Sequence, residues 1–257
     1  MLRLAVSCVD LTSLDGRETP EKINSLCATA CRPAEGEGPT AAVCVYPSFV
    51  AQARKALGAA GPVRLASVVG FPTGQEPLEL KLHKARNAMV DGANEIDMVL
   101  NRQAFLAGEH ARAREEVAAM VRLCGSRARV KVILETGELG GPANVRAASL
   151  LALGALRQGD FIKTSTGKVP VNATLESHQV MLEAIRDHHR ATGVAVGIKP
   201  AGGIKTAQDA LGYLAAVQAT LGPAWLTPER YRFGASSLLN DLLLRIKSQT
   251  APAPDLG

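Results

Sequence analysis

The sequence predicts an α/β protein built as a single (β/α)8 TIM barrel over residues 1–250, and three observations support this. The chain has 257 residues, 47% of them apolar, which matches the usual size of one such barrel and is enough for a large core. Eight strand-like segments alternate with segments of helical periodicity. No GxGxxG follows the first strand-like segment, which disfavours the alternative, a doubly wound open sheet.

The predicted strands are short apolar runs, each followed by a segment with helical spacing. They are residues 4–9, 41–46, 63–69, 95–100, 130–134, 161–164, 195–199 and 231–234. The segment 76–91 illustrates the helices, because Leu82, Ala85 and Met89 gather on one side of it. Strand followed by helix, repeated along the chain, is typical of a parallel barrel.

Start and stop signals for helices fit the same division. Thr19, Thr174 and Thr206 are expected to cap the N-termini of helices, and Pro20 suits a first helical position. Four glycines are expected where helices end: Gly92, Gly108, Gly125 and Gly193. The Pro-rich stretch 251–257 is predicted to be a flexible tail outside the barrel.

Charge and cysteine content exclude several classes of protein. The net charge is +5 and no basic run occurs, so we expect no nucleic-acid partner, whereas a small anionic substrate fits. Asp10 interrupts the N-terminal apolar stretch, and the apolar run 147–156 is too short to span a bilayer. The five cysteines lack CxxC spacing. We therefore expect a reduced, cytoplasmic protein without a membrane partner.

Three charged residues fall near the carboxyl ends of predicted strands, where chemistry collects in barrels: Asp97, Lys163 and Lys199. Two ammonium groups in one poorly hydrated pocket repel, so one lysine should be a neutral, nucleophilic amine near pH 7. Asp97 could stabilise the remaining cation and shuttle a proton through water. The alternative is a purely structural role, in which each lysine reaches solvent or forms a structural ion pair. This alternative explains one such lysine better than it explains the three residues together.

Glycine-rich loops after the sixth, seventh and eighth strands predict an anion site. Barrels often bind phosphate there, because glycine allows close backbone approach and helix N-termini supply N–H donors. The predicted phosphate-binding residues are Gly167, Lys168, Gly202, Gly203, Lys205, Gly234, Ser236 and Ser237.

The remaining polar candidates have weaker patterns. Asp10, Cys44 and Lys131 are possible pocket residues, and Lys131 is expected to pair with a carboxylate inside the barrel. Glu135 and Glu138 are interpreted as part of a polar network between a strand and its loop. The five histidines form no metal-ligand spacing and are expected to be solvated, and no metal site is predicted.

Several segments, in order along almost the whole chain, resemble the deoxyribose-phosphate aldolase family of class I aldolases. They are Asp10-Leu-Thr, Cys44-Val-Tyr-Pro47, Gly70-Phe-Pro-Thr-Gly74, Glu95-Ile-Asp-Met-Val99, Lys131-Val-Ile-Leu-Glu-Thr-Gly-Glu-Leu139, Phe161-Ile-Lys-Thr-Ser-Thr-Gly-Lys168, Lys199-Pro-Ala-Gly-Gly-Ile204 and Arg232-Phe-Gly-Ala-Ser-Ser237. The two lysine motifs are the most specific of these.

The resemblance implies a Schiff base between Lys163 and 2-deoxy-D-ribose 5-phosphate, and cleavage to D-glyceraldehyde 3-phosphate and acetaldehyde. It also implies that Lys199 perturbs the pKa of Lys163, that Asp97 transfers protons, and that the glycine loops hold the phosphate. No metal or cofactor is implied. Well-known members of the family end in a tyrosine that reaches the site, whereas this chain ends in Asp-Leu-Gly, so no such contribution is expected. Lys205 stands where some relatives have arginine.

Two other functions fit the same sequence pattern. One is another barrel lyase or isomerase, including transaldolase-like carbon transfer or pyridoxal-phosphate chemistry on Lys163. The other is a sugar-phosphate binding module in which the lysines only neutralise charge. We also expect a homo-oligomer, with a dimer favoured, although barrel exteriors of this kind also suit monomers and tetramers.

Overall fold

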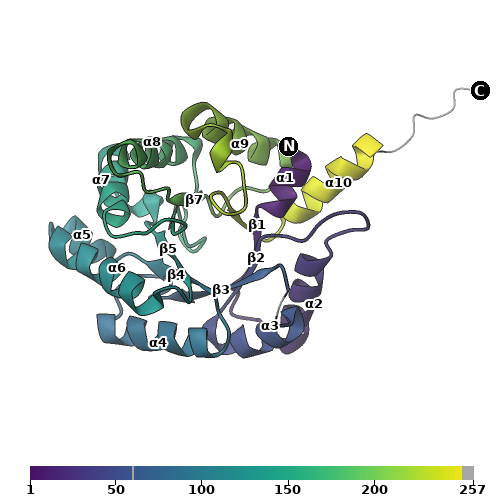
Figure 1. Cartoon of the computed structure of the whole chain (residues 1–257), viewed down its shortest axis with the longest axis horizontal. Helices are drawn as coiled ribbons and strands as arrows, with labels where there is room; N and C mark the ends of the chain where they lie inside the picture. The colour runs from purple at the N-terminus through teal and green to yellow at the C-terminus, as the bar shows by residue number, and fades with distance from the viewer. Residues whose placement is uncertain (60, 251–257) are drawn as a thin grey trace, which may run out of the picture.

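The computed structural model describes residues 1–59 and 61–250, and within them eight parallel strands form one sheet. Neighbouring strands follow the order β7-β6-β5-β4-β3-β2-β1-β8. The strands are β1 (Val9–Ser13), β2 (Ala42–Val45), β3 (Arg64–Val69), β4 (Glu95–Val99), β5 (Arg129–Ile133), β6 (Phe161–Lys163), β7 (Gly197–Lys199) and β8 (Phe233–Ala235). Figure 1 shows the helices arranged around the outside of these strands.

The sheet curls until its two ends meet, which makes it a nearly closed barrel. β1 pairs in parallel with both β2 and β8. β7 and β8 are joined by the isolated bridges Ile198–Tyr231 and Ala201–Gly234 rather than by a continuous ladder. The predicted (β/α)8 TIM barrel is therefore confirmed.

The helices lie between successive strands and begin at the expected caps. They are α1 (Leu2–Ser7), α2 (Pro20–Cys31), α3 (Val50–Leu57), α4 (Leu78–Val90), α5 (Arg102–Leu106), α6 (His110–Cys124), α7 (Pro142–Leu153), α8 (Leu175–Thr192), α9 (Ala207–Leu221) and α10 (Leu238–Thr250). Short 3-10 turns occur at η1 (Pro47–Phe49), η2 (Thr136–Glu138) and η3 (Pro223–Trp225). The Thr19, Thr174 and Thr206 side chains each accept a bond from a backbone N–H in the first turn. None of the described helices is both long and apolar enough to cross a bilayer.

The first predicted strand, residues 4–9, is wrong. Residues Leu2–Ser7 form helix α1, which packs against α9 and α10, and the first strand starts at Val9. A short apolar run does not distinguish a strand from a buried helix, and the true strand was hidden because Asp10 interrupts its apolar pattern. The other seven predicted strands overlap those observed. The predicted tail, 251–257, lies outside the described residues.

Alternation along each strand separates an apolar outer face from a different inner face. Ile96, Met98, Val130, Val132, Ile162 and Ile198 point outward into the core between the sheet and the helices. The residues between them in sequence, such as Asp97, Lys131, Lys163 and Lys199, are fully or almost fully buried and point into the barrel. The barrel interior, which usually holds branched apolar side chains, is therefore largely ionic here.

Candidate active site

The three predicted catalytic residues meet in the centre of the barrel. Asp97 Oδ2 accepts hydrogen bonds from Lys163 Nζ and Lys199 Nζ, each at 2.9 Å. Lys163 and Lys199 are register partners on β6 and β7, so their side chains leave the sheet side by side. Asp97 reaches them from β4 across the interior, which a narrow eight-stranded barrel allows. The predicted convergence of these residues is confirmed.

The two lysines differ in how many carboxylates surround them. Lys199 Nζ lies 2.7 Å from Asp10 Oδ2 as well as 2.9 Å from Asp97, whereas Lys163 pairs with Asp97 alone among the described residues. Burial, together with the charge of Lys199, lowers the pKa of Lys163 against the opposing effect of Asp97. Burial would also lower the pKa of Lys199, but Asp10 and Asp97 outweigh it and raise that pKa.

Asp97 is held ionised by the cations around it. Burial alone would favour its neutral form, but Lys131, Lys163 and Lys199 outweigh burial and hold the pKa of Asp97 well below its usual range. Its Oδ1 accepts a 2.7 Å hydrogen bond from Lys131 Nζ, the register partner of Asp97 on β5. The expected pairing of Lys131 with a barrel carboxylate is therefore confirmed. The site thus pairs a permanent carboxylate and a permanent ammonium with the one amine that is easiest to deprotonate.

A second layer of charges lies deeper in the barrel. Arg232 Nη1 lies 2.5 Å from Asp10 Oδ1, and Arg232 Nη2 lies 2.9 Å from Glu95 Oε1. Lys131 Nζ lies 2.6 Å from Glu95 Oε2. Glu95 and Arg232 were not predicted as site residues. The signal that could have found them is their spacing, because Glu95 precedes Asp97 by two positions and so shares its inward face.

Phe161 and Gly197 form the floor beneath the two lysines. They are register partners, each two residues before its lysine. A Cβ atom at Gly197 would lie 2.5 Å from the Phe161 ring, so glycine is required for this close approach. The guanidinium of Arg232 lies over the same ring, 5.4 Å from its centroid. The Phe161 ring therefore packs closely against Gly197 and lies under the Arg232 guanidinium.

The β2 and β3 side of the interior is apolar. Cys44 is fully buried in a small cluster with Leu14, Ala66 and Val68, packed by Tyr46 and Phe71. Burial raises the pKa of the Cys44 thiol, and the charge of Asp97 acts in the same direction. Cys44 therefore faces the charged centre as a neutral thiol, which is consistent with its prediction as a possible pocket residue.

The predicted phosphate-binding loops are neighbours at the carboxyl ends of β6, β7 and β8. Gly202 N–H donates to Gly234 O at 3.4 Å, and a Cβ atom on Gly202 would lie 2.8 Å from the Asn172 side chain. Gly202 and Gly203 adopt left-handed φ values of 80° and 84°, which favour glycine. The side chains of Lys168, Lys205, Ser236 and Ser237 are exposed around this edge.

Glu135 forms a polar network at the end of β5. It has a left-handed φ of 57°, and its carboxylate accepts hydrogen bonds from Thr166 N at 3.0 Å and Thr166 Oγ1 at 2.5 Å. Arg102 Nη1 lies 3.2 Å from the same carboxylate. The network connects the loop after β6 to the loop after β5. Glu135 is therefore part of a polar network at the end of its strand, as predicted. Glu138 forms part of the adjoining 3-10 turn.

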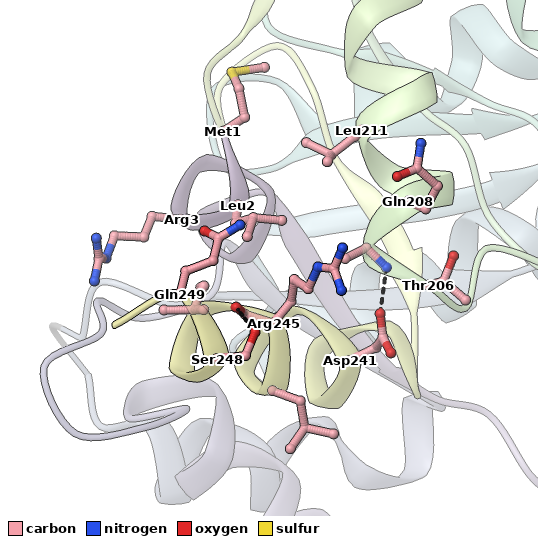
Figure 2. Close-up of a pocket in the computed structure, with 13 residues that line it drawn as sticks. Met1, Leu2, Arg3, Thr206, Gln208, Leu211, Asp241, Arg245, Ser248 and Gln249 are labelled. Atoms are coloured by element: carbon pink, nitrogen blue, oxygen red, sulfur yellow. Dashed lines mark hydrogen bonds between the residues drawn. The ribbon is translucent and has the colours of Figure 1, made fainter. Parts of the chain in front are cut away.

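Two surface cavities of about 760 and 800 Å³ flank α10, away from the lysines. Figure 2 shows the first, lined by residues of α1, α9 and α10, where Asp241 accepts a hydrogen bond from Ala207 N at 2.6 Å. Neither cavity is lined by a predicted catalytic or phosphate-binding residue. Gly203 and Ser236 border smaller hollows of about 420 and 280 Å³.

The expectation that the histidines are solvated is wrong for His178. Its ring is fully buried, 4.9 Å from the Tyr213 ring centroid, and neither ring nitrogen has a hydrogen-bond partner among the described residues. Burial lowers the pKa of His178 to about 3. The ring acts as a core side chain of α8. No group of three or more His, Cys, Asp or Glu side chains in the described part of the chain could hold a metal ion.

Comparison with known proteins gives matches over most of the chain. A family model described as DeoC/LacD family aldolase matches residues 4–243. A protein of Agrobacterium fabrum named deoxyribose-phosphate aldolase is 46% identical over 241 residues, covering 93% of this chain and 89% of its own length. One of the same name from Mus musculus is 48% identical over 251 residues, covering 93% and 78% respectively.

Solved structures show the same fold. A crystal structure titled as a putative deoxyribose-phosphate aldolase from Toxoplasma gondii superimposes with a TM-score of 0.83 at 25% identity, covering 96% of this chain and 94% of that one. A deoxyribose phosphate aldolase from Aeropyrum pernix, titled as a unique tetrameric structure, gives a TM-score of 0.71 at 25% identity, covering 97% and 94%.

Proposed function

This chain belongs to the DeoC/LacD family of aldolases, and from that premise we propose that it cleaves 2-deoxy-D-ribose 5-phosphate through a Schiff base on Lys163. The reversible reaction gives D-glyceraldehyde 3-phosphate and acetaldehyde. The observation that carries the proposal is the unequal pairing of the two central lysines. Lys163 shares one carboxylate oxygen of Asp97 with Lys199, and Lys199 also contacts the carboxylate of Asp10.

The proposed chemistry begins with attack of the Lys163 amine on the aldehyde carbon of the open-chain sugar. The carbinolamine that forms loses water to give an iminium ion, and the positive nitrogen then accepts the electron pair of the C2–C3 bond. Removal of the C3 hydroxyl proton breaks that bond and releases D-glyceraldehyde 3-phosphate. The remaining two-carbon enamine is protonated and hydrolysed, which releases acetaldehyde and restores the amine.

Asp97 and Lys199 supply the proton transfers and the electrostatic bias. Lys199 stays charged because of Asp10 and Asp97, so it disfavours a second ammonium on Lys163. Asp97, whose Oδ2 lies 2.9 Å from both lysine nitrogens, moves protons between the bound sugar and the site through water. Asp10 and Lys131 hold these groups in place, and Cys44 lines the apolar side of the pocket.

The phosphate is proposed to bind at the loops after β6, β7 and β8. Backbone N–H groups at Gly167, Gly202, Gly203 and Gly234 approach it closely, and Lys168, Lys205, Ser236 and Ser237 add charge and hydroxyl donors. Lys205 supplies a point charge without the two-pronged geometry of arginine. Replacing Lys205 with Met should raise KM for the phosphorylated sugar and leave KM for acetaldehyde in the reverse direction unchanged.

Acetaldehyde with borohydride tests the nucleophile. The expected product is an irreversible two-carbon adduct on Lys163, located by peptide mass mapping without any added cofactor. Lys163→Ala should abolish the adduct, and Lys55→Ala, which removes an exposed lysine on α3, should retain it. An adduct on another residue, or a requirement for pyridoxal phosphate, would refute the proposal. Absence of D-glyceraldehyde 3-phosphate release would instead favour a sugar-phosphate binding module.

Domain organisation, assembly and location remain proposals. We propose that residues 1–250 fold as one domain, which limited proteolysis would test by leaving that span intact. We propose a homodimer in the cytoplasm, with no nucleic-acid or membrane partner. The tetrameric title of the Aeropyrum pernix relative makes a tetramer the alternative outcome of analytical ultracentrifugation.

A further inference from the structure

Six of the buried charged side chains inside the barrel form a closed ring in which cations and anions alternate. The ring runs through Arg232, Asp10, Lys199, Asp97, Lys131 and Glu95 and back to Arg232, with successive N···O distances of 2.5, 2.7, 2.9, 2.7, 2.6 and 2.9 Å. These residues, which we call the charge ring, come from β1, β4, β5, β7 and the position just before β8. Every member has a partner of opposite charge on each side.

Lys163 lies outside the charge ring. Each ring cation contacts at least two carboxylates, whereas Lys163 contacts a single oxygen of Asp97, which Lys199 also contacts. The ring holds three cations and three anions and is therefore balanced without Lys163. A proton on Lys163 would add one uncompensated positive charge to a buried site, where such a charge is unfavourable. Charge balance therefore selects Lys163 as the amine that loses its proton.

We propose that Glu95 and Arg232, in the ring segment beyond the lysine pair, are positioning residues that keep Lys163 as the free amine of the site. The inference rests on the proposed Schiff-base function. Neither residue needs to touch the substrate. Arg232 holds Asp10 against Lys199, and Glu95 holds Lys131 against Asp97. Removing either charge changes the balance that Lys163 experiences, and the two removals act in opposite directions.

Other charged and titratable groups lie close to Lys163 and to the charge ring. Facing Lys163 are Asp97 on β4, Lys199 on β7 and the Cys44 thiol on β2. Outside the ring, Arg64 Nε lies 3.7 Å from Glu95 Oε1, and Arg129 is electrostatically coupled to Glu95. The Arg64 side chain is 40% exposed, so water screens its charge more strongly than the charges of the ring.

The test is the pH dependence of borohydride trapping of acetaldehyde on Lys163 in three variants. Arg232→Met leaves one negative charge in excess, so the acid limb of the profile should move to higher pH. Glu95→Gln leaves one positive charge in excess, so the limb should move to lower pH. Each shift should be about one pH unit, which is about tenfold in trapping rate on the acid side. The double variant Arg232→Met with Glu95→Gln should return the limb towards its original position.

A charge-conserving variant separates electrostatics from packing. Arg232→Lys keeps the charge but loses the two-pronged contact, so its limb should stay near that of the unmodified protein. Shifts in the same direction for both single variants, or no shift, would overturn the inference. If Arg232→Met fails to fold by circular dichroism, the nearly isosteric Glu95→Gln decides alone, and an unshifted limb overturns the inference. If the unmodified protein gives no adduct on Lys163, the proposed function itself has failed.

Discussion

Replacing Lys199 with Met should suppress Schiff-base formation at neutral pH and restore it at alkaline pH. The Nζ atoms of Lys163 and Lys199 each lie 2.9 Å from Asp97 Oδ2, so they are at most about 6 Å apart. Two unit charges at about 6 Å repel by about 3 kcal/mol at an effective dielectric constant of about 20. Without Lys199 that repulsion is lost, so the pKa of Lys163 rises.

The fraction of Lys163 present as the neutral amine at pH 7 should fall about a hundredfold, because 1.36 kcal/mol corresponds to about a factor of ten in a proton equilibrium. The variant should still fold, since Asp10 keeps Arg232 and Lys131 as partners and Asp97 keeps Lys131 and Lys163. The assay is the rate of acetaldehyde trapping on Lys163 from pH 6 to 10, with the adduct quantified by mass spectrometry.

Two results would refute this reasoning. A Lys199→Met protein that traps acetaldehyde at the original rate at pH 7 would show that Lys199 does not bias the amine. A loss that persists at pH 10 would show that Lys199 is needed for something other than charge. Lys55→Met is the matched control, because it removes one exposed cation on α3 and should leave the profile unchanged.

Three further predictions concern stability. His178 has an unfolded pKa of 6.5 and a folded pKa of about 3, so between these two values it binds a proton only in the unfolded chain. The free energy of unfolding should therefore decrease as the pH is lowered through that window. Between pH 7 and 5 the unmodified protein should lose about 2 kcal/mol more than His178→Leu in urea titrations, and parallel losses would contradict this. Gly197→Ala should lower the free energy of unfolding by about 1–3 kcal/mol, because the new Cβ would lie 2.5 Å from the Phe161 ring. Gly212→Ala is the matched control in the same titration, because a Cβ there meets nothing within 4 Å and should be neutral or stabilising. Thr206→Ala should lower the unfolding free energy by about 1 kcal/mol through loss of the α9 cap, and Thr206→Ser should retain it in thermal melts; equal melting temperatures for the two would contradict a capping role.

The proposed catalytic trio could be predicted from sequence because its members lie on strands, Lys163 and Lys199 at the last positions of β6 and β7 and Asp97 within β4. Asp97, Lys163 and Lys199 each follow an apolar residue that faces outward, so alternation alone directs them inward. Parallel strands then carry their carboxyl ends to one face of the barrel. What sequence could not supply was the detail of the pairing, in which both lysines share Asp97 Oδ2 and Lys199 also contacts Asp10.

Two of the failed predictions have one physical source, which is polarity where apolar patterns are expected. Asp10 breaks the pattern of β1, so the neighbouring helix α1 was mistaken for the first strand. Glu95, at the first position of β4, and Arg232, one residue before β8, also point into the barrel, although a charge ordinarily indicates a solvated face. His178 was expected to be solvated, but it occupies the same helical side as Met181, Leu182 and Ile185, a spacing that is typical of a buried face.

The proposed phosphate-binding residues illustrate a different limit. Their order along three consecutive loops follows from the barrel topology alone. The close contact of Gly202 with Asn172 and Gly234 depends on left-handed turns and on the bridge between Ala201 and Gly234. Loop conformations of this kind are set by neighbouring residues in the folded protein, and glycine is the only sign of them in the sequence.

The outward and inward faces of the strands serve different purposes, the first stability and the second chemistry. Outward residues such as Ile96, Val132 and Ile198 belong to one continuous apolar shell, while Cys44, Ala66 and Val68 form a cluster apart from it within the axis. Folding free energy comes mainly from the shell, because that is where most apolar surface leaves water. The axis is therefore the place where new reactions could be evolved, provided that each exchanged cation is matched by an exchanged anion.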